Sequence, residues 1–69
     1  MNVKDLLEKR ANVWEQAKAL IDAAEAEGRD FIAEEQAQYD KMMDEMDGLA
    51  KRAKRLEEKQ RLEAQLPNR

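Results

Sequence analysis

Apolar residues recur at three- and four-residue spacing in two stretches of the chain, separated by a short polar break around Gly28 and Asp30. The first stretch contains Val3, Leu6, Leu7, Val13, Trp14, Ala17, Leu20, Ile21 and Ala24. The second contains Tyr39, Met42, Met43, Met46, Leu49, Ala50, Ala53 and Leu56. This period is typical of amphipathic helices, and the break predicts a turn between them. The predicted fold is all-α, a two-helix antiparallel hairpin with coiled-coil-like packing.

The pattern defines one helical-hairpin domain. Its predicted parts within residues 1–69 are a helix over 3–27, a turn over 28–32 and a helix over 33–65. Asn2 is a suitable N-cap, and Gly28 suits the left-handed residue that follows many helices. Asp30 or the backbone near Ile32 is expected to cap the second helix. Pro67 is expected to end it, because proline cannot continue the helical hydrogen-bond pattern.

Heptad spacing predicts which side chains meet. Leu7, Trp14 and Ile21 form one predicted core row, and folding about residue 30 places Trp14 opposite Met46, with Gly48 leaving room for the indole. The accompanying rows are Arg10, Ala17 and Ala24 in the first helix, and Met43 with Ala50 and Met46 with Ala53 in the second. The predicted core and interface residues are Leu7, Val13, Trp14, Ile21, Met43, Met46, Leu49, Leu56, Leu62 and Leu66.

The second predicted helix is longer than the first. Past about residue 59 it has no counterpart in the first helix, so Leu62 and Leu66 lack a partner within the hairpin. Leu, Ile, Val and Phe together number only 12 of 69 residues, so the expected core is thin. A short chain with a thin core usually needs a partner. Self-association into a homo-oligomer is therefore expected.

Composition removes most catalytic chemistry. The chain has no Cys, His, Ser or Thr, which excludes disulfides, the usual zinc ligand sets and the common nucleophiles. We expect no enzymatic activity, no cofactor and no metal site. No stretch approaches the roughly 20 apolar residues that span a bilayer, and no signal-peptide pattern is visible. The chain is expected to be soluble and cytoplasmic, without a membrane partner.

Charge is segregated along the chain. Residues 22–47 hold ten acidic and two basic residues, whereas residues 48–69 hold seven basic and three acidic residues. Asp40, Asp44 and Asp47 share a helical face, but one face cannot supply the six to eight oxygens that calcium takes, so a solvated face is expected. The basic residues at 51, 52, 54 and 55 are followed at once by glutamates, without aromatic residues for base stacking. Nucleic-acid binding is therefore not expected.

One stretch is more specific than the periodicity. It begins at Ala24-Glu25-Ala26-Glu27-Gly28-Arg29, continues through Glu34-Glu35 and ends at Tyr39-Asp40. Together with Leu7-Glu8-Lys9-Arg10-Ala11, Met46-Asp47-Gly48-Leu49 and Arg55-Leu56-Glu57, it resembles the N-terminal scaffolding (delta) domain of the tailed-phage major capsid protein family. The resemblance covers essentially the whole chain. Ile32 departs from it, because family members often carry a helix-capping Thr there, and Ile has no capping oxygen.

The resemblance implies a built-in assembly scaffold. In that family the domain precedes the capsid shell domain and guides subunits into hexamers and pentamers. It lies inside the procapsid, in the host cytoplasm, until the maturation protease removes it. The expected partners are then other copies of the chain, the capsid shell domain and that protease. The chain is expected to be either the scaffold portion of a capsid protein or a stand-alone derivative.

Two other functions fit the residues. A coiled-coil adaptor of a cellular system would use the same apolar stripes, and a capsid domain encoded downstream would distinguish the scaffold from it. A nucleic-acid-associated helical protein is the second alternative, and salt-dependent DNA binding near neutral pH would support it.

Overall fold

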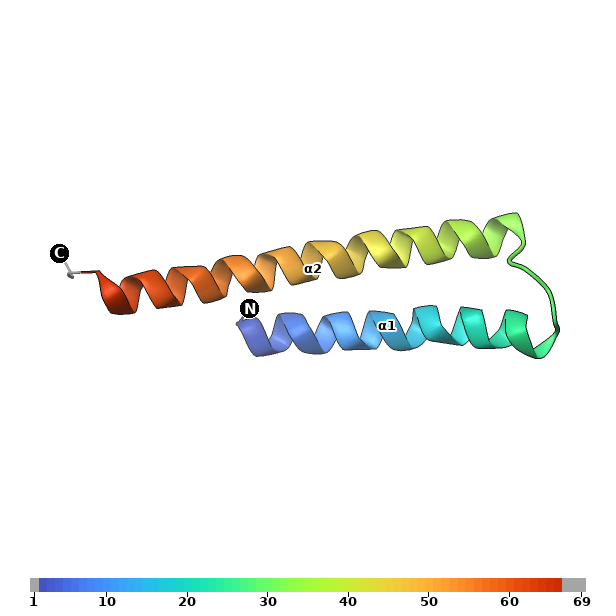
Figure 1. The fold of residues 1–69 in the computed structure, drawn as a ribbon, viewed down its shortest axis with the longest axis horizontal. Coiled ribbons are helices and arrows are strands. Elements are labelled where there is room, and N and C mark those ends of the chain that lie inside the picture. The colour runs from blue at the N-terminus through green and yellow to red at the C-terminus, as the bar shows by residue number, and fades with distance from the viewer. Residues whose placement is uncertain (1, 67–69) are drawn as a thin grey trace.

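The protein folds as two antiparallel helices joined by a short turn, as Figure 1 shows for the computed structural model, which describes residues 2–66. Helix α1 is Val3–Ala26 and helix α2 is Ala33–Gln65. The described residues contain no strand. The predicted all-α helical hairpin is thereby confirmed. Pro67, the predicted stop of the second helix, lies outside the described residues.

The hairpin is a rod rather than a compact globule. Its extents are 59 × 17 × 15 Å and its radius of gyration is 17.0 Å. A compact chain of this length would have a radius of gyration of about 11 Å. The two helices share a single line of contact, and every other side of each helix faces solvent.

Both ends of α1 have the hydrogen bonds that its sequence favours. The Asn2 side chain accepts a hydrogen bond from the backbone N–H of Asp5 at 2.8 Å. At the other end Gly28 has a φ of 63°, its N–H bonds the Glu25 carbonyl, and the Arg29 N–H bonds the Ala24 carbonyl. This is the Schellman arrangement, which satisfies carbonyls that the helix itself leaves free. The helix ends one residue earlier than predicted, because residue 27 is its C-cap.

Helix α2 begins without a capping side chain. Ile32 is its N-cap in an extended conformation and offers no side-chain acceptor. The Glu35 carboxylate compensates in part by accepting the backbone N–H of Ile32 at 3.1 Å. This is one half of a capping box, the half that a Glu three residues into a helix supplies.

The core is a heptad seam one residue out of step with the predicted row. Leu6 is completely buried, and Val13, Leu49 and Ala53 are buried with it. The side chains packed against this cluster are Val3, Met42, Met46 and Leu56. Along α1 the seam continues through the buried Ala17 and Ala24. These positions follow the alternating three- and four-residue spacing of a coiled-coil seam.

The prediction of Trp14 as the central core residue is wrong. Its side chain is 39% exposed, and Leu7 in the same predicted row is 43% exposed. Both residues lie immediately beside a better seam, formed by Leu6 and Val13, and α2 cannot cover both rows at once. Leu7 therefore lies outside the core cluster, and Leu6 packs in that cluster with Ala53.

Gly48 does not make room for the indole. A Cβ placed on this residue would meet no atom within 4 Å, so the position faces open space. Gly48 lies inside α2 with ordinary helical geometry, where glycine is less favourable than alanine because it loses more backbone freedom on folding.

The two glycines should respond in opposite directions to alanine. Gly48→Ala should raise the free energy of unfolding by about 0.5–1 kcal/mol, because it removes backbone entropy at an open helical position. Gly28→Ala should lower it, because φ at Gly28 is positive. Urea unfolding followed by far-ultraviolet circular dichroism measures both. Destabilisation by Gly48→Ala would show that this position is occupied by a neighbouring side chain.

The seam also predicts how two apolar truncations compare. Leu6→Ala should lower the free energy of unfolding by about 2–5 kcal/mol, the range found for fully buried leucines. Trp14→Ala should lower it by less, since much of the indole is already in water. The comparison is made by thermal and urea unfolding at low protein concentration, where association contributes least. A larger loss of unfolding free energy for Trp14→Ala than for Leu6→Ala would indicate that the indole is buried in the core.

Candidate interaction surface

The two sides of the hairpin seam differ in polarity. Each heptad contributes two residues to the seam, and the residue directly after the second of these lies on one side of the seam. In an antiparallel pair, the residues of this kind from both helices lie on the same side of the hairpin. Over the shared length they form a mainly apolar flank, made of Leu7, Trp14, Ile21, Met43 and Ala50, with Gln36 at the end nearest the turn. The opposite side is a polar flank, made of Lys9, Gln16, Ala23, Gln38, Glu45 and Arg52. An interaction surface built on packing would use the apolar flank.

A shallow depression lies on this apolar flank. Its lining residues are Leu7, Arg10, Ala11, Trp14 and Met46, and its volume is about 450 Å³. Trp14 and Met46 thus lie near one another, as the pairing predicted, but at the surface rather than in the core. Arg10 is exposed and lines the same depression.

The far end of α2 is a second uncovered region. Leu56 packs on the same core cluster as Val3, the first residue of α1, so α1 has nothing to place against residues 57–66. Figure 1 shows this part of α2 extending beyond the N-terminus as a single helix. Leu62 and Leu66 are 46% and 60% exposed there. We call residues 57–66 the overhang.

The ten predicted core and interface residues separate by burial. The buried ones are Val13 and Leu49, and the half-buried ones are Ile21, Met43, Met46 and Leu56. The exposed ones are Leu7, Trp14, Leu62 and Leu66. The ten predicted residues do not include four that are buried, which are Leu6, Ala17, Ala24 and Ala53. The three alanines stood in the predicted accompanying rows, whereas Leu6 was in none of the predicted rows.

The turn is held by an ion-pair clasp. Both terminal nitrogens of Arg29 bond Glu35, at 2.7 and 3.1 Å, and its Nε bonds Glu27 at 3.0 Å. The hydrogen bond from Arg29, and then that from the Ile32 N–H, lower the pKa of Glu35. The clasp joins the end of α1 to the first turn of α2. Phe31 and Tyr39 pack beside it with ring centroids 5.5 Å apart.

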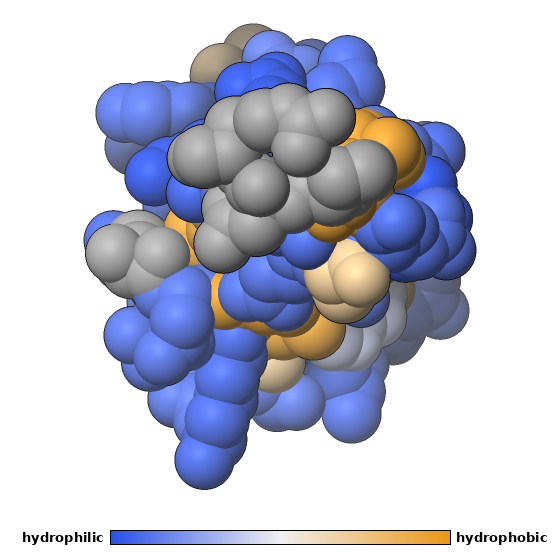
Figure 2. Space-filling model, turned by 90° about the vertical axis from the view of Figure 1, so that its left-hand side faces the viewer, coloured by the Kyte–Doolittle hydropathy of each residue, from blue (hydrophilic) through white to orange (hydrophobic). Residues whose placement is uncertain are grey.

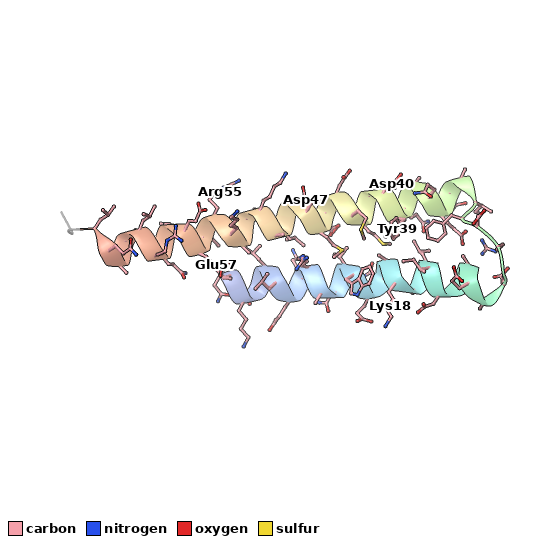
Figure 3. All side chains as sticks on the ribbon, viewed as in Figure 1. Lys18, Tyr39, Asp40, Asp47, Arg55 and Glu57 are labelled. Carbon is pink, nitrogen blue, oxygen red and sulfur yellow. The ribbon has the colours of Figure 1, made fainter. Side chains whose placement is uncertain are left out.

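Charged side chains occupy the outward faces. Figure 3 shows Asp40 and Arg55 on the side of α2 away from α1, whereas Tyr39 lies between the helices. Asp47 pairs with Lys51 at 3.0 Å, the only i,i+4 ion pair among the described residues. In the end-on view of Figure 2, hydrophilic residues surround most of the rod and apolar patches show between them. The predicted solvated acidic face is consistent with this placement.

Residues 2–66 contain no group of three or more side chains that could hold a metal ion. Neither described helix combines the length and apolarity that a membrane crossing requires. Comparison with protein-family models, curated proteins and solved structures found no match.

The clasp makes the stability of the hairpin sensitive to acid. A lowered native pKa means that the charged Glu35 contributes stability above its unfolded pKa of about 4.3, and that this contribution is lost as the pH falls through the native pKa. Glu35→Gln keeps an acceptor for the Ile32 N–H but removes the charge. We expect it to flatten the fall in melting temperature below about pH 4.3. Circular dichroism melts between pH 7 and pH 2 measure this fall.

Glu34→Gln is the matched control, because Glu34 lies in the same helical turn, is exposed and forms no ion pair among the described residues. It should leave the acid dependence close to that of the parent chain. Equal flattening by both variants would assign the effect to the overall negative charge of the turn rather than to the clasp.

Proposed function

We propose that this hairpin is a scaffolding domain, which directs phage procapsid assembly through helix-mediated self-association. The observation that carries the self-association is the apolar flank. Leu7 and Trp14 leave large apolar side chains in water beside an intact seam, although the chain has few large apolar residues to spare. Contiguous apolar surface of this kind marks interaction sites on soluble proteins.

The thin core supports the same proposal. The fully buried side chains of the main cluster are few, and two of the buried seam residues of α1 are alanines. A second helical layer on the apolar flank would bury more apolar area in each copy than the hairpin can bury alone. Since burial contributes roughly 25 cal/mol per Å² of apolar surface, association would strengthen the fold itself.

The phage assignment is supported by the sequence resemblance around the Glu-Gly-Arg turn. Under this proposal the scaffold is joined to a capsid shell domain, acts inside the procapsid in the host cytoplasm, and is removed by the maturation protease. It has no catalytic role and needs no cofactor. Its work is to hold neighbouring subunits at a chosen spacing until the shell has formed.

A cellular coiled-coil adaptor remains the first alternative, since it would use the same flank. The gene context distinguishes the two, because a scaffold of this type is encoded directly before a capsid shell domain. The nucleic-acid alternative rests on the basic residues between positions 51 and 55. It predicts DNA binding that weakens steeply as salt rises, which fluorescence anisotropy with a labelled duplex would detect.

Substitutions on the two flanks test the self-association. Leu7→Ser with Trp14→Ser should weaken association at least tenfold, which corresponds to about 1.4 kcal/mol. The control is Lys9→Ser with Gln16→Ser, which alters the same two heptads on the polar flank. Sedimentation velocity from micromolar to millimolar concentration measures both. A parent chain that remains monomeric throughout this range would contradict the proposed function.

A further inference from the structure

The surface of the hairpin is large for its mass. The accessible area is 5582 Å² for a chain of 8.0 kDa. A compact monomer of this mass would expose about 4,500 Å². The excess, on the order of 1,000 Å² per chain, is comparable to the roughly 800 Å² that each partner buries in a standard specific interface. The rod therefore has room for a dimer interface along one side without losing its own seam.

The apolar flank is suited to meet a copy of itself. Its largest exposed side chains, Leu7 and Trp14, are one heptad apart on α1 and border the depression that Met46 also lines. A two-fold axis close to Trp14 would bring the flank of one chain against the same flank of another. Such an isologous contact is self-complementary and closed.

Charge selects between the two orientations of such a dimer. On one side of the Met46 level lies a basic segment, residues 51–55, which has no acidic residue. Arg52 belongs to the polar flank, so Lys51 and Lys54 are the residues of this segment that can face a partner on the apolar flank. The segment lies about 8–14 Å from that level along the helix axis. On the other side lie acidic residues at comparable distances. Asp40 is about 9 Å away along α2, and Asp22 and Glu25 are about 12 and 17 Å beyond Trp14 along α1.

In a parallel dimer the basic segment of one chain would face the basic segment of the other, and the two acidic ends would likewise face each other. In an antiparallel dimer, reversal about Trp14 places the basic segment of one chain over the acidic residues of the other, twice. Where such charges approach within the screening length of about 8 Å at physiological salt, opposite charges would attract and like charges would repel.

We propose that the partner of the apolar flank is a second copy of this chain, bound antiparallel about a two-fold axis near Trp14. This inference rests on the proposed self-association and adds its face and orientation. In the dimer the turn of each copy extends alongside the open end of the other.

Cross-linking tests the orientation directly, because the chain has no cysteine of its own. Lys4 and Glu25 are both exposed, lie three heptads apart on one face of α1, and stand about equally far on either side of Trp14. Full-length chains carrying Lys4→Cys or Glu25→Cys are mixed and treated with a short bismaleimide. The antiparallel dimer gives mostly mixed cross-links between the two chains, which mass spectrometry distinguishes.

The control pair is Lys9→Cys and Ala23→Cys, which lie on the polar flank on either side of Trp14, about 8 and 14 Å from it along α1. It should give few cross-links. Cross-links between identical chains at position 4 and at position 25 would show a parallel dimer and overturn the proposed orientation. Efficient cross-linking by the polar-flank pair would overturn the proposed face. In both cases the proposed function would stand, whereas a monomer without cross-links would contradict both.

Charge reversal gives a second measurement. Lys51→Glu, Lys54→Glu and Arg55→Glu together should weaken dimerisation at least tenfold. The control changes net charge equally but at scattered positions, with Lys18→Glu, Lys41→Glu and Lys59→Glu. Sedimentation at two salt concentrations compares the sets. Equal weakening by both sets would show that net charge alone governs association and would overturn the antiparallel pairing.

Discussion

A pair of helices has only one seam in which to bury apolar side chains, and this constraint determines the rest of the molecule. Each helix presents an apolar stripe wider than its partner can cover. The seam takes the row that contains Leu6 and Val13, and the neighbouring row that contains Leu7 and Trp14 is left at the surface. The apolar side chains that the seam cannot bury within one chain are left exposed and are available for contact with another molecule.

The choice of row follows from side-chain size. Ala17, Ala24 and Ala53 occupy buried seam positions, and small residues allow two helix backbones to approach closely. An indole in that seam would hold the helices apart at these small residues. Placing Trp14 beside the seam avoids this, at the expense of an exposed aromatic ring. The clasp between Arg29 and Glu35 holds the turn, and the turn determines which residues of the two helices lie opposite one another.

The sequence was sufficient for the architecture and for the helix ends. The Asn2 cap, the left-handed Gly28 and the change of period at the turn are local signals, and the structure has all three. The core row was harder to predict, because Leu6 and Leu7, and likewise Val13 and Trp14, are adjacent apolar residues with the same heptad period. Local spacing cannot separate two such rows. The decision depends on how closely the whole second helix can approach, which is a property of both helices together.

The same reasoning separates what apolar packing and charge each contribute to association. In the proposed dimer, apolar area on the flank would supply the attraction, because exposed ion pairs in water contribute little individually and are screened by salt. That flank is nearly symmetric about Trp14 and cannot by itself distinguish one orientation from its reverse. The uneven charge along the rod can, since it penalises one arrangement and favours the other. The proposed scaffolding function would need this combination, in which orientation is specified while binding stays weak enough to be undone.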